Sequence, residues 1–401
     1  MLRKSLLTIA LLSLAAPAAA QARADDAYAR YELLAPASGS FRVVLDVTVS
    51  KAGATSYVEP LPAGAAATDV TAIEVMTGTA LVVRRRPGAI EVRLSRPVAE
   101  GAETRIRLSA TYKAAGQYSR HGDAVEFRRT IAAPRNAIVL PASYELTAAN
   151  LPVQVIEEAD GRIAVSFMNL SPAAMPVAIR AREVKPRPAS ETAAPGAAPL
   201  PPAAEAPARD QPLNQIRVSE RALQDREIVY FLKQPETHAF SLYHDYTASR
   251  EGEHQYVNVV RAGSRVSDPS AKILDTGEVL KTRTLTGADV VREKIDIPDR
   301  VQPETELVLI PFGPVRKGQS LRLRISETYA DPARYDLVDG QLMWHRSFGR
   351  PRNDMVLPEG WYLTTSSIPA VVSAEPDGRI RLSFWNPRPD SVDVFVKARR
   401  R

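Results

Sequence analysis

The chain has 401 residues, a formal net charge of +6, no cysteine and five histidines. This length allows two or three domains that each bury a core. The lack of cysteine excludes disulfides and a cysteine nucleophile. Acidic and basic residues interleave throughout, which excludes the one-sided basic surface of a nucleic-acid-binding protein.

Residues 1–20 have the pattern of a secretory signal peptide. Arg3 and Lys4 precede an apolar stretch over residues 6–16, and small residues at 18–20 supply a cleavage site. The apolar stretch is shorter than the ~20 residues that a membrane-spanning helix needs, and no later stretch approaches that length. We therefore expect a periplasmic or secreted protein with no transmembrane segment in the mature chain.

The rest of the chain repeats itself. Residues 127–182 align without a gap with residues 344–399 at a shift of 217, and 23 of the 56 positions are identical. Tyr31 to Gly78 recurs as Tyr230 to Gly277 at a shift of 199. Constant shifts over such lengths indicate duplication, so we predict two copies of one domain, at residues 25–182 and 215–401. The difference between the shifts (217 − 199 = 18) predicts an insertion in the second copy near residues 286–303.

Each copy has the pattern of short β-strands. Apolar residues alternate with mostly polar ones from Phe41 to Val49, which is the period of a half-buried strand. Asp160-Gly161 and Asp377-Gly378 separate pairs of such runs and are typical of tight hairpins. The sequence therefore predicts an all-β fold of two tandem antiparallel β-sandwich (immunoglobulin-like) domains with about seven to ten strands each.

Residues 183–214 differ from both copies in composition. Proline and alanine make up 17 of these 32 residues. A segment of this kind buries little apolar area and favours an extended, semi-stiff tether. We expect few contacts to cross this Pro/Ala-rich linker, and therefore two separate bodies that fold independently.

Potential metal ligands are concentrated in the second copy. His238, His244 and His254 occur within 17 residues of one another, beside several carboxylates, and imidazole and carboxylate are the ligands of zinc. The spacing matches no known ligand pattern, and strand alternation places His244 where the first copy has the core-like Leu45. Two interpretations remain: a structural or surface cluster, which we favour, and a metal site formed by these three histidines.

The tryptophans also lie in the second copy, where Trp361 and Trp385 replace Tyr144 and Met168. Exchange among large side chains favours core packing, but alternation places Trp385 opposite the apolar face of its strand. Exposed aromatic rings hold sugars in many β-sandwich modules.

Two arginines that both copies share complete the set of candidate residues. Arg352 and Arg379 have the chemistry to bind an anion by bidentate contacts, although solvated surface positions are the interpretation we favour. The candidate ligand-binding residues are Trp385, Trp361, Arg352 and Arg379.

Local motifs of known catalytic classes are missing from the sequence. There is no Gly-x-Ser-x-Gly, no His-Glu-x-x-His, no phosphate-binding loop and no dinucleotide fingerprint. We predict an exported, non-enzymatic cell-envelope binding or scaffolding protein that uses no cofactor and whose partner is an envelope protein or a glycan. The alternative is a metal-dependent hydrolase or a carbohydrate-binding module with its site in the second copy. Ligand and oligomeric state are left open.

Overall fold

The computed structural model describes residues 27–61, 64–114, 116–171, 173–185, 227–260, 263–295, 297, 301–388 and 390–401. The predicted signal peptide and residues 186–214 of the predicted linker lie outside the described residues. Within these ranges, no helix has the length and apolar character needed to cross a membrane.

The described residues of the first copy form fourteen strands in three sheets. The strands are β1 (Tyr28–Leu33), β2 (Ser40–Val49), β3 (Ser56–Pro60), β4 (Ala66–Glu74), β5 (Val82–Arg86), β6 (Ala89–Arg93), β7 (Thr104–Lys113), β8 (Tyr118–His121), β9 (Ala124–Ile131), β10 (Arg135–Val139), β11 (Tyr144–Ala149), β12 (Gln154–Glu157), β13 (Ile163–Met168) and β14 (Met175–Glu183). A seven-stranded sheet has the order β12-β13-β10-β1-β2-β7-β4. A four-stranded sheet, β11-β14-β9-β8, and a three-stranded sheet, β3-β6-β5, accompany it.

The second copy repeats this arrangement. Its strands are β15 (Glu227–Leu232), β16 (Ala239–Ala248), β17 (Gln255–Val259), β18 (Arg265–Ile273), β19 (Val279–Leu280), β20 (Arg283–Thr286), β21 (Glu306–Pro311), β22 (Leu321–Ala330), β23 (Tyr335–Val338), β24 (Gln341–Phe348), β25 (Arg352–Val356), β26 (Trp361–Ser366), β27 (Val371–Ala374), β28 (Ile380–Trp385) and β29 (Val392–Arg400). The eight-stranded sheet has the order β19-β18-β22-β16-β15-β25-β28-β27. β2 and β16 begin 199 residues apart and β7 and β22 begin 217 residues apart, so the duplication seen in the sequence is present strand by strand.

The all-β sandwich architecture is confirmed, with three differences in detail. The described residues of the two copies form fourteen and fifteen strands, more than the seven to ten predicted for each. Each copy has three sheets, because the β3-β6-β5 and β17-β21-β20 units form sheets of their own. One pairing in each large sheet is parallel, β1 with β10 and β15 with β25, whereas antiparallel pairing throughout was predicted. The parallel pair arises because β10 returns to the large sheet only after the chain has passed through the smaller sheets.

Aromatic residues fill the space between the sheets of each copy. In the first copy, the Phe41 ring of β2 meets the Phe127 ring of β9 edge to face, with centroids 5.2 Å apart. Both side chains are fully buried, which contributes about 1.5–3 kcal/mol for each side chain. In the second copy, Tyr230 meets Trp344 in the same way at 5.4 Å.

The additional residues of the second copy lie between β20 and β21. They include the short helix α2 (Gly287–Glu293), which begins with a capping box between Thr286 and Asp289. Val290 of the helix is buried against Leu285 and Leu307. The first copy has only the turn between β5 and β6 at this position.

The two copies pack directly against each other, and the prediction of two separate bodies is wrong. The Val153 N–H donates to the Ala370 carbonyl at 2.9 Å, and the Ala370 N–H donates to the Val153 carbonyl at 3.0 Å. These residues are equivalents, since 153 + 217 = 370. Likewise β11 packs on β27 and β12 packs on β26. Equivalent surfaces therefore meet as they do in a two-fold dimer.

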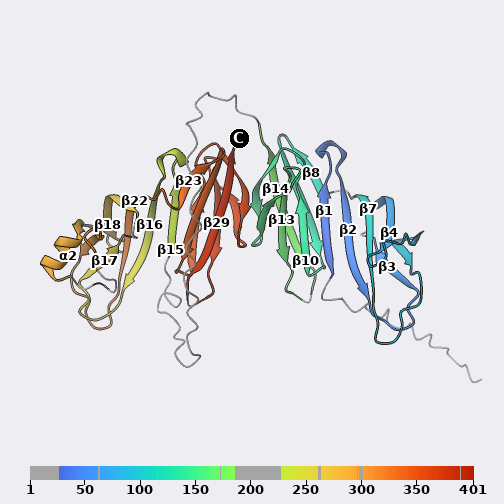
Figure 1. Cartoon of the computed structure of the whole chain (residues 1–401), viewed down its shortest axis with the longest axis horizontal. Helices are drawn as coiled ribbons and strands as arrows, with labels where there is room; N and C mark the ends of the chain where they lie inside the picture. Colours follow the sequence, from blue (N-terminus) through green and yellow to red (C-terminus); the bar gives the residue numbers. More distant parts are fainter. Residues whose placement is uncertain are drawn as a thin grey trace, which may run out of the picture.

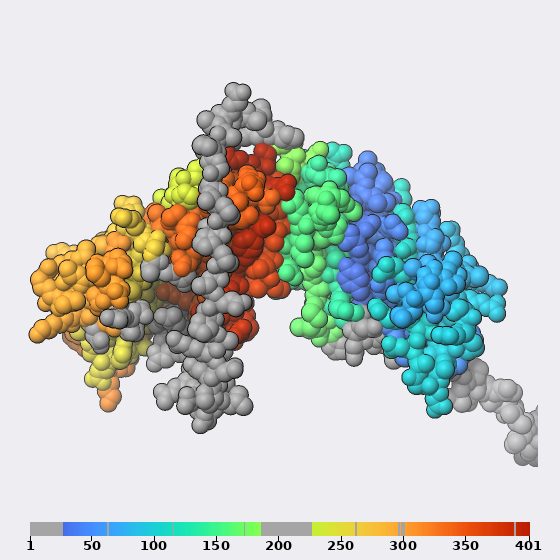
Figure 2. Space-filling model, in the orientation of Figure 1, coloured from blue at the N-terminus to red at the C-terminus, as the bar shows by residue number. Residues whose placement is uncertain are grey.

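The packing covers strands that would otherwise have open edges. β11, β12, β26 and β27 are all edge strands of their sheets, and an uncovered edge promotes aggregation. Figure 1 shows β29 of the second copy near β14 and β13 of the first at the centre of an arched molecule. In Figure 2, the red and green residues meet there in a continuous surface.

A buried ion pair stabilises the contact between the two copies. The Glu145 carboxylate, 0% exposed, accepts hydrogen bonds from Arg182 Nη2 at 2.8 Å and from Arg401 Nε at 2.7 Å. Arg182 belongs to the first copy and Arg401 to the second. A second pair across the contact joins Arg399 to Glu157 at 3.2 Å.

Candidate functional site

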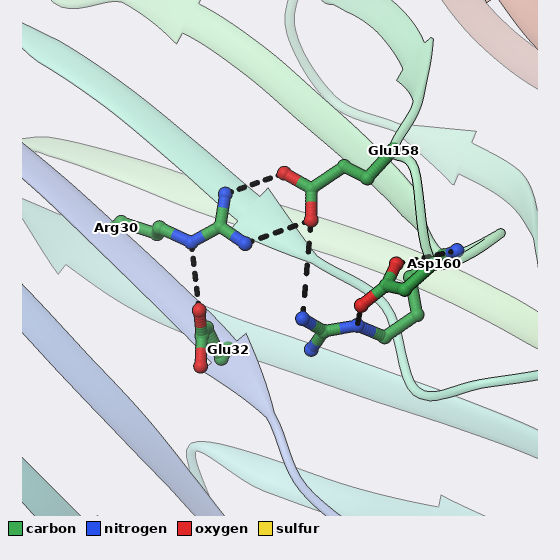
Figure 3. Close-up of polar contacts among 5 residues, drawn as sticks. Arg30, Glu32, Glu158 and Asp160 are labelled. Carbon is green, nitrogen blue, oxygen red and sulfur yellow. Dashed lines mark hydrogen bonds and ion pairs between the residues drawn. The ribbon is translucent and has the colours of Figure 1, made fainter.

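The outer face of the large sheet in the first copy is a network of charges (Figure 3). Arg30 of β1 donates to both oxygens of Glu158, at 2.5 and 2.8 Å, and to Glu32 at 2.8 Å. Arg162 donates to Asp160 at 2.7 Å. The hydrogen bond with Glu158 raises the pKa of Arg30, and the same bond lowers the pKa of Glu158. Each of these charges is therefore paired with one of opposite sign within the network.

The second copy has three aromatic residues on the corresponding face of its large sheet. Phe231 occupies the position of Glu32, and Tyr243 occupies the position of Val44. Their ring centroids lie 6.1 Å apart. Trp385 occupies the position of Met168. We call this outward surface the aromatic face; it includes Phe231, Tyr243, Trp385, Arg324, Arg352 and Asp354.

Arginines cover two of the three rings of the aromatic face. The guanidinium carbon of Arg324 lies 4.1 Å from the centroid of the Tyr243 ring, and that of Arg379 lies 5.9 Å from the centroid of the Phe231 ring. Cation–π contacts of this kind contribute about 0.5–1 kcal/mol at exposed sites. They fix the rings in place and leave them half-buried.

The arginines of the aromatic face are paired with carboxylates. Arg324 donates to both oxygens of Asp245, at 2.8 and 2.9 Å, and this hydrogen bonding raises the pKa of Arg324. Arg381 pairs with Asp354 at 2.7 Å, and Arg352 lies 3.8 Å from Glu227. Arg379 pairs with Asp377 at 2.7 Å. The face is therefore polar but close to neutral in charge.

Trp385 is the exposed ring of this face. It is 64% exposed, and the strand register places Arg352 directly opposite it on β25. The next residue, Asn386, is buried, and its Nδ2 donates to the carbonyls of Phe348 and Asp390 at 2.9 and 2.8 Å. Asn169 makes the same contacts in the first copy, at 3.1 and 3.0 Å. Trp385 is thus presented from a rigidly braced turn.

Trp361, a candidate ligand-binding residue from the sequence, has a buried ring and is instead a packing residue. It is 1% exposed, its Nε1 donates to Gln234 Oε1 at 2.9 Å, and the Arg400 guanidinium lies 5.0 Å from its ring centroid. Of the candidate residues, Arg352, Arg379 and Trp385 lie on one face, and Trp361 lies in the interior. Alternation along β28 identified Trp385 correctly as the outward ring.

The three histidines are held in separate structural roles. His238 ends a 3-10 turn in the left-handed conformation (φ 50°) and its Nδ1 lies 2.9 Å from the Tyr335 carbonyl. His244 is buried in β16, with its ring 5.6 Å from that of Tyr256. His254 is exposed in a turn and contacts the Gly252 carbonyl. Within the described part of the chain, no three His, Asp or Glu side chains gather as a metal ion requires.

A seam at which the three sheets of each copy meet was not predicted from the sequence. In the first copy, Arg129 of β9 lies 5.5, 5.7 and 5.8 Å from the ring centroids of Tyr31, Phe41 and Tyr112. Glu59 of β3 faces it and accepts a hydrogen bond from Tyr57. Burial raises the pKa of Glu59, and the charge of Arg129 opposes this shift.

The second copy builds the seam with a different carboxylate. Asn258 stands at the position of Glu59, and its Nδ2 donates to both oxygens of Glu327, at 3.0 and 2.8 Å. Glu327, on β22, is 2% exposed, and its burial raises its pKa. The equivalent arginine, Arg346, pairs with the buried Asp331 at 3.0 Å. The only sequence signal was the recurrence of the arginine, Arg129 and Arg346.

Comparisons with known proteins add little to this description. No family model matches the chain, and no curated protein matches it. An M1 zinc metallopeptidase from Deinococcus radiodurans aligns with 39% of this chain and 41% of its own, at 14% identity and a TM-score of 0.29. An aminopeptidase N family protein from Idiomarina loihiensis aligns with 38% of this chain and 29% of its own, at 9% identity and a TM-score of 0.27. A collagen adhesin from S. aureus aligns with 78% and 81%, at 6% identity and a TM-score of 0.19.

The chain thus spans about two fifths of the length of the Deinococcus peptidase. Likenesses this low carry no argument about activity.

Proposed function

We propose that the protein is an exported, non-enzymatic binding protein of the cell envelope and that the aromatic face of its second copy is the binding surface. One observation supports this more than any other. At three equivalent positions, the first copy has Glu32, Val44 and Met168 and the second has Phe231, Tyr243 and Trp385. The first copy acts as an internal reference, because the strands beneath these side chains are the same.

At all three positions, a non-aromatic residue of the first copy is replaced by an aromatic residue in the second. Aromatic residues are enriched in binding surfaces because they offer large contact area at low entropic cost. Fold stability does not require them here, since the first copy maintains the same sheet with Glu32, Val44 and Met168 at these positions. Direct packing between the copies then holds this surface in a fixed place on one elongated body.

Exchanging these residues for their first-copy equivalents tests the proposal. The triple variant Phe231→Glu, Tyr243→Val, Trp385→Met is compared with wild type for sedimentation with purified cell-wall sacculi and with envelope vesicles. We expect the wild-type chain to be retained by one of these fractions and the triple variant to be released. The matched control is Met168→Ala on the first copy, which we expect to be retained. Retention of the triple variant at the wild-type level contradicts the assignment of the binding face.

Export is tested separately. N-terminal sequencing of the protein from the envelope fraction should give a first residue between Ala18 and Asp26. A chain that begins at Met1 contradicts the predicted signal peptide and the envelope location with it.

A further inference from the structure

We propose that the aromatic face binds a neutral polysaccharide, with one sugar ring stacked on Trp385. This inference rests on the proposed function and names the class of its ligand. Trp385 supplies the flat apolar surface that the C–H face of a sugar ring contacts. It is the exposed member of the three tryptophans, since Trp344 and Trp361 are 0% and 1% exposed.

The charge balance of the face determines which polymer fits. The positive charges of Arg324, Arg352 and Arg381 are each paired with a carboxylate, Asp245, Glu227 and Asp354 respectively. A polyanion binds to unpaired cations, which displace the counterions condensed on the polyanion, whereas this face offers a near-equal number of both signs. Hydroxyl groups are both donors and acceptors, so a neutral sugar can contact guanidinium and carboxylate groups alike.

Polar groups lie beside Trp385 where they can orient a stacked ring. Arg352 is directly opposite Trp385 across the strand pair, and two residues further along the same face Asp354 is directly opposite Ser383. This pattern combines one aromatic platform with a few polar side chains that can fix the orientation of a ligand. The braced turn at Asn386 keeps the platform fixed before the ligand arrives, which lowers the entropic cost of binding.

The spacing of the aromatic residues favours a chain of sugars over a single ring. Phe231 is opposite Val356 and Trp385 is opposite Arg352, so the two rings are separated by two strand spacings across the sheet and four residues along it. At ~4.8 Å between strands and ~3.3 Å per residue, this separation is roughly 16 Å. A ligand that uses both ends of the aromatic face must therefore be an oligomer.

The experiment uses the mature full-length chain and soluble oligomers of glucose and of N-acetylglucosamine with one to six units. Intrinsic fluorescence is the readout, because Trp385 is the tryptophan that solvent quenchers reach. We expect an oligomer of one of the two series to protect Trp385 from acrylamide, with an affinity that rises with chain length. Trp385→Met, which lacks the exposed fluorophore and is therefore followed by isothermal titration calorimetry beside wild type, should weaken binding about tenfold or more, as for a central aromatic contact. Phe231→Glu should weaken the longer oligomers and leave the shorter ones unchanged. Raising the salt concentration should change the affinity little, because the ligand is neutral.

Three outcomes overturn the inference. One is protection by an anionic polymer such as heparin, with a steep loss of affinity in salt; another is protection by an unrelated unstructured peptide. The third is no protection by any oligomer of either series. If the third outcome occurs while sacculi or vesicles still retain the wild-type chain and release the triple variant, the ligand class is wrong and the proposed function remains. If retention also fails, both are wrong.

Discussion

The contact between the two copies provides the sharpest prediction. Glu145 is 0% exposed and accepts hydrogen bonds from one arginine of each copy, Arg182 and Arg401. The change Glu145→Gln keeps the shape of the side chain and one acceptor but removes the charge. Both arginines then face a buried neutral group, and we expect the two copies to lose their coupling.

The magnitude follows from the burial of the three side chains. Removing one partner of a fully buried ion pair costs about 3–5 kcal/mol. Arg182 and Arg401 are 32% and 20% exposed, so they recover some hydration in the variant. We therefore expect a loss near the lower end, about 3 kcal/mol.

A matched control lies on the same copy. Glu126 also contacts two arginines, Arg128 at 2.7 Å and Arg180 at 3.3 Å, but both are about three fifths exposed (60% and 61%) and belong to one copy. Exposed pairs contribute little, so Glu126→Gln should cost less than about 1 kcal/mol.

Urea unfolding followed by two probes distinguishes the variants. All three tryptophans lie in the second copy, so fluorescence reports that copy while circular dichroism reports both. For wild type the two curves should coincide, because one cooperative unit unfolds. For Glu145→Gln they should separate into two midpoints. If Glu145→Gln and Glu126→Gln have the same effect and both keep coincident curves, Glu145 does not couple the copies.

Three further outcomes are expected. Burial raises the pKa of Glu327 above its unfolded value of about 4.3, so its stabilising contribution is complete below that pH and is lost as the pH rises through the folded pKa. In urea unfolding, Glu327→Gln should therefore have the same free energy of unfolding as wild type near pH 4 and a larger one at pH 8. A variant that is less stable than wild type at pH 8 contradicts this. Trp361→Phe loses the hydrogen bond to Gln234 and should lower the unfolding free energy by about 1–3 kcal/mol with no change in ligand retention; a loss of retention would return Trp361 to the binding surface. Asn386→Ala should loosen the turn that carries Trp385, visible as increased acrylamide quenching, and unchanged quenching contradicts the bracing role.

Much of the fold was predictable because it depends on local pattern and on repetition. The alternation from Phe41 to Val49 and the two Asp-Gly turns specify strands and hairpins over a few residues. The constant shifts then extend each observation to the other copy. Counting along β28 was enough to predict that Trp385 points away from the core, because side chains alternate strictly between the two faces of a strand.

The packing of the copies was not predictable in the same way. A Pro/Ala-rich segment indicates a tether, but its composition does not determine what the bodies at its ends do. The contact depends on edges of sheets, and the order of strands in a sheet is not written in any local pattern. Val153 and Ala370 look like ordinary strand residues until the register shows that each pairs with its own equivalent.

The buried carboxylates of the seam show why aligning the two copies hides some sites. The arginine keeps its position, as Arg129 and Arg346, so the alignment reveals it. The carboxylate comes from β3 in the first copy, as Glu59, and from β22 in the second, as Glu327. Electrostatic interaction depends on distance and burial and not on which strand carries the charge. A duplicated site can therefore keep a carboxylate at a similar place in space although the alignment of the two copies no longer shows it.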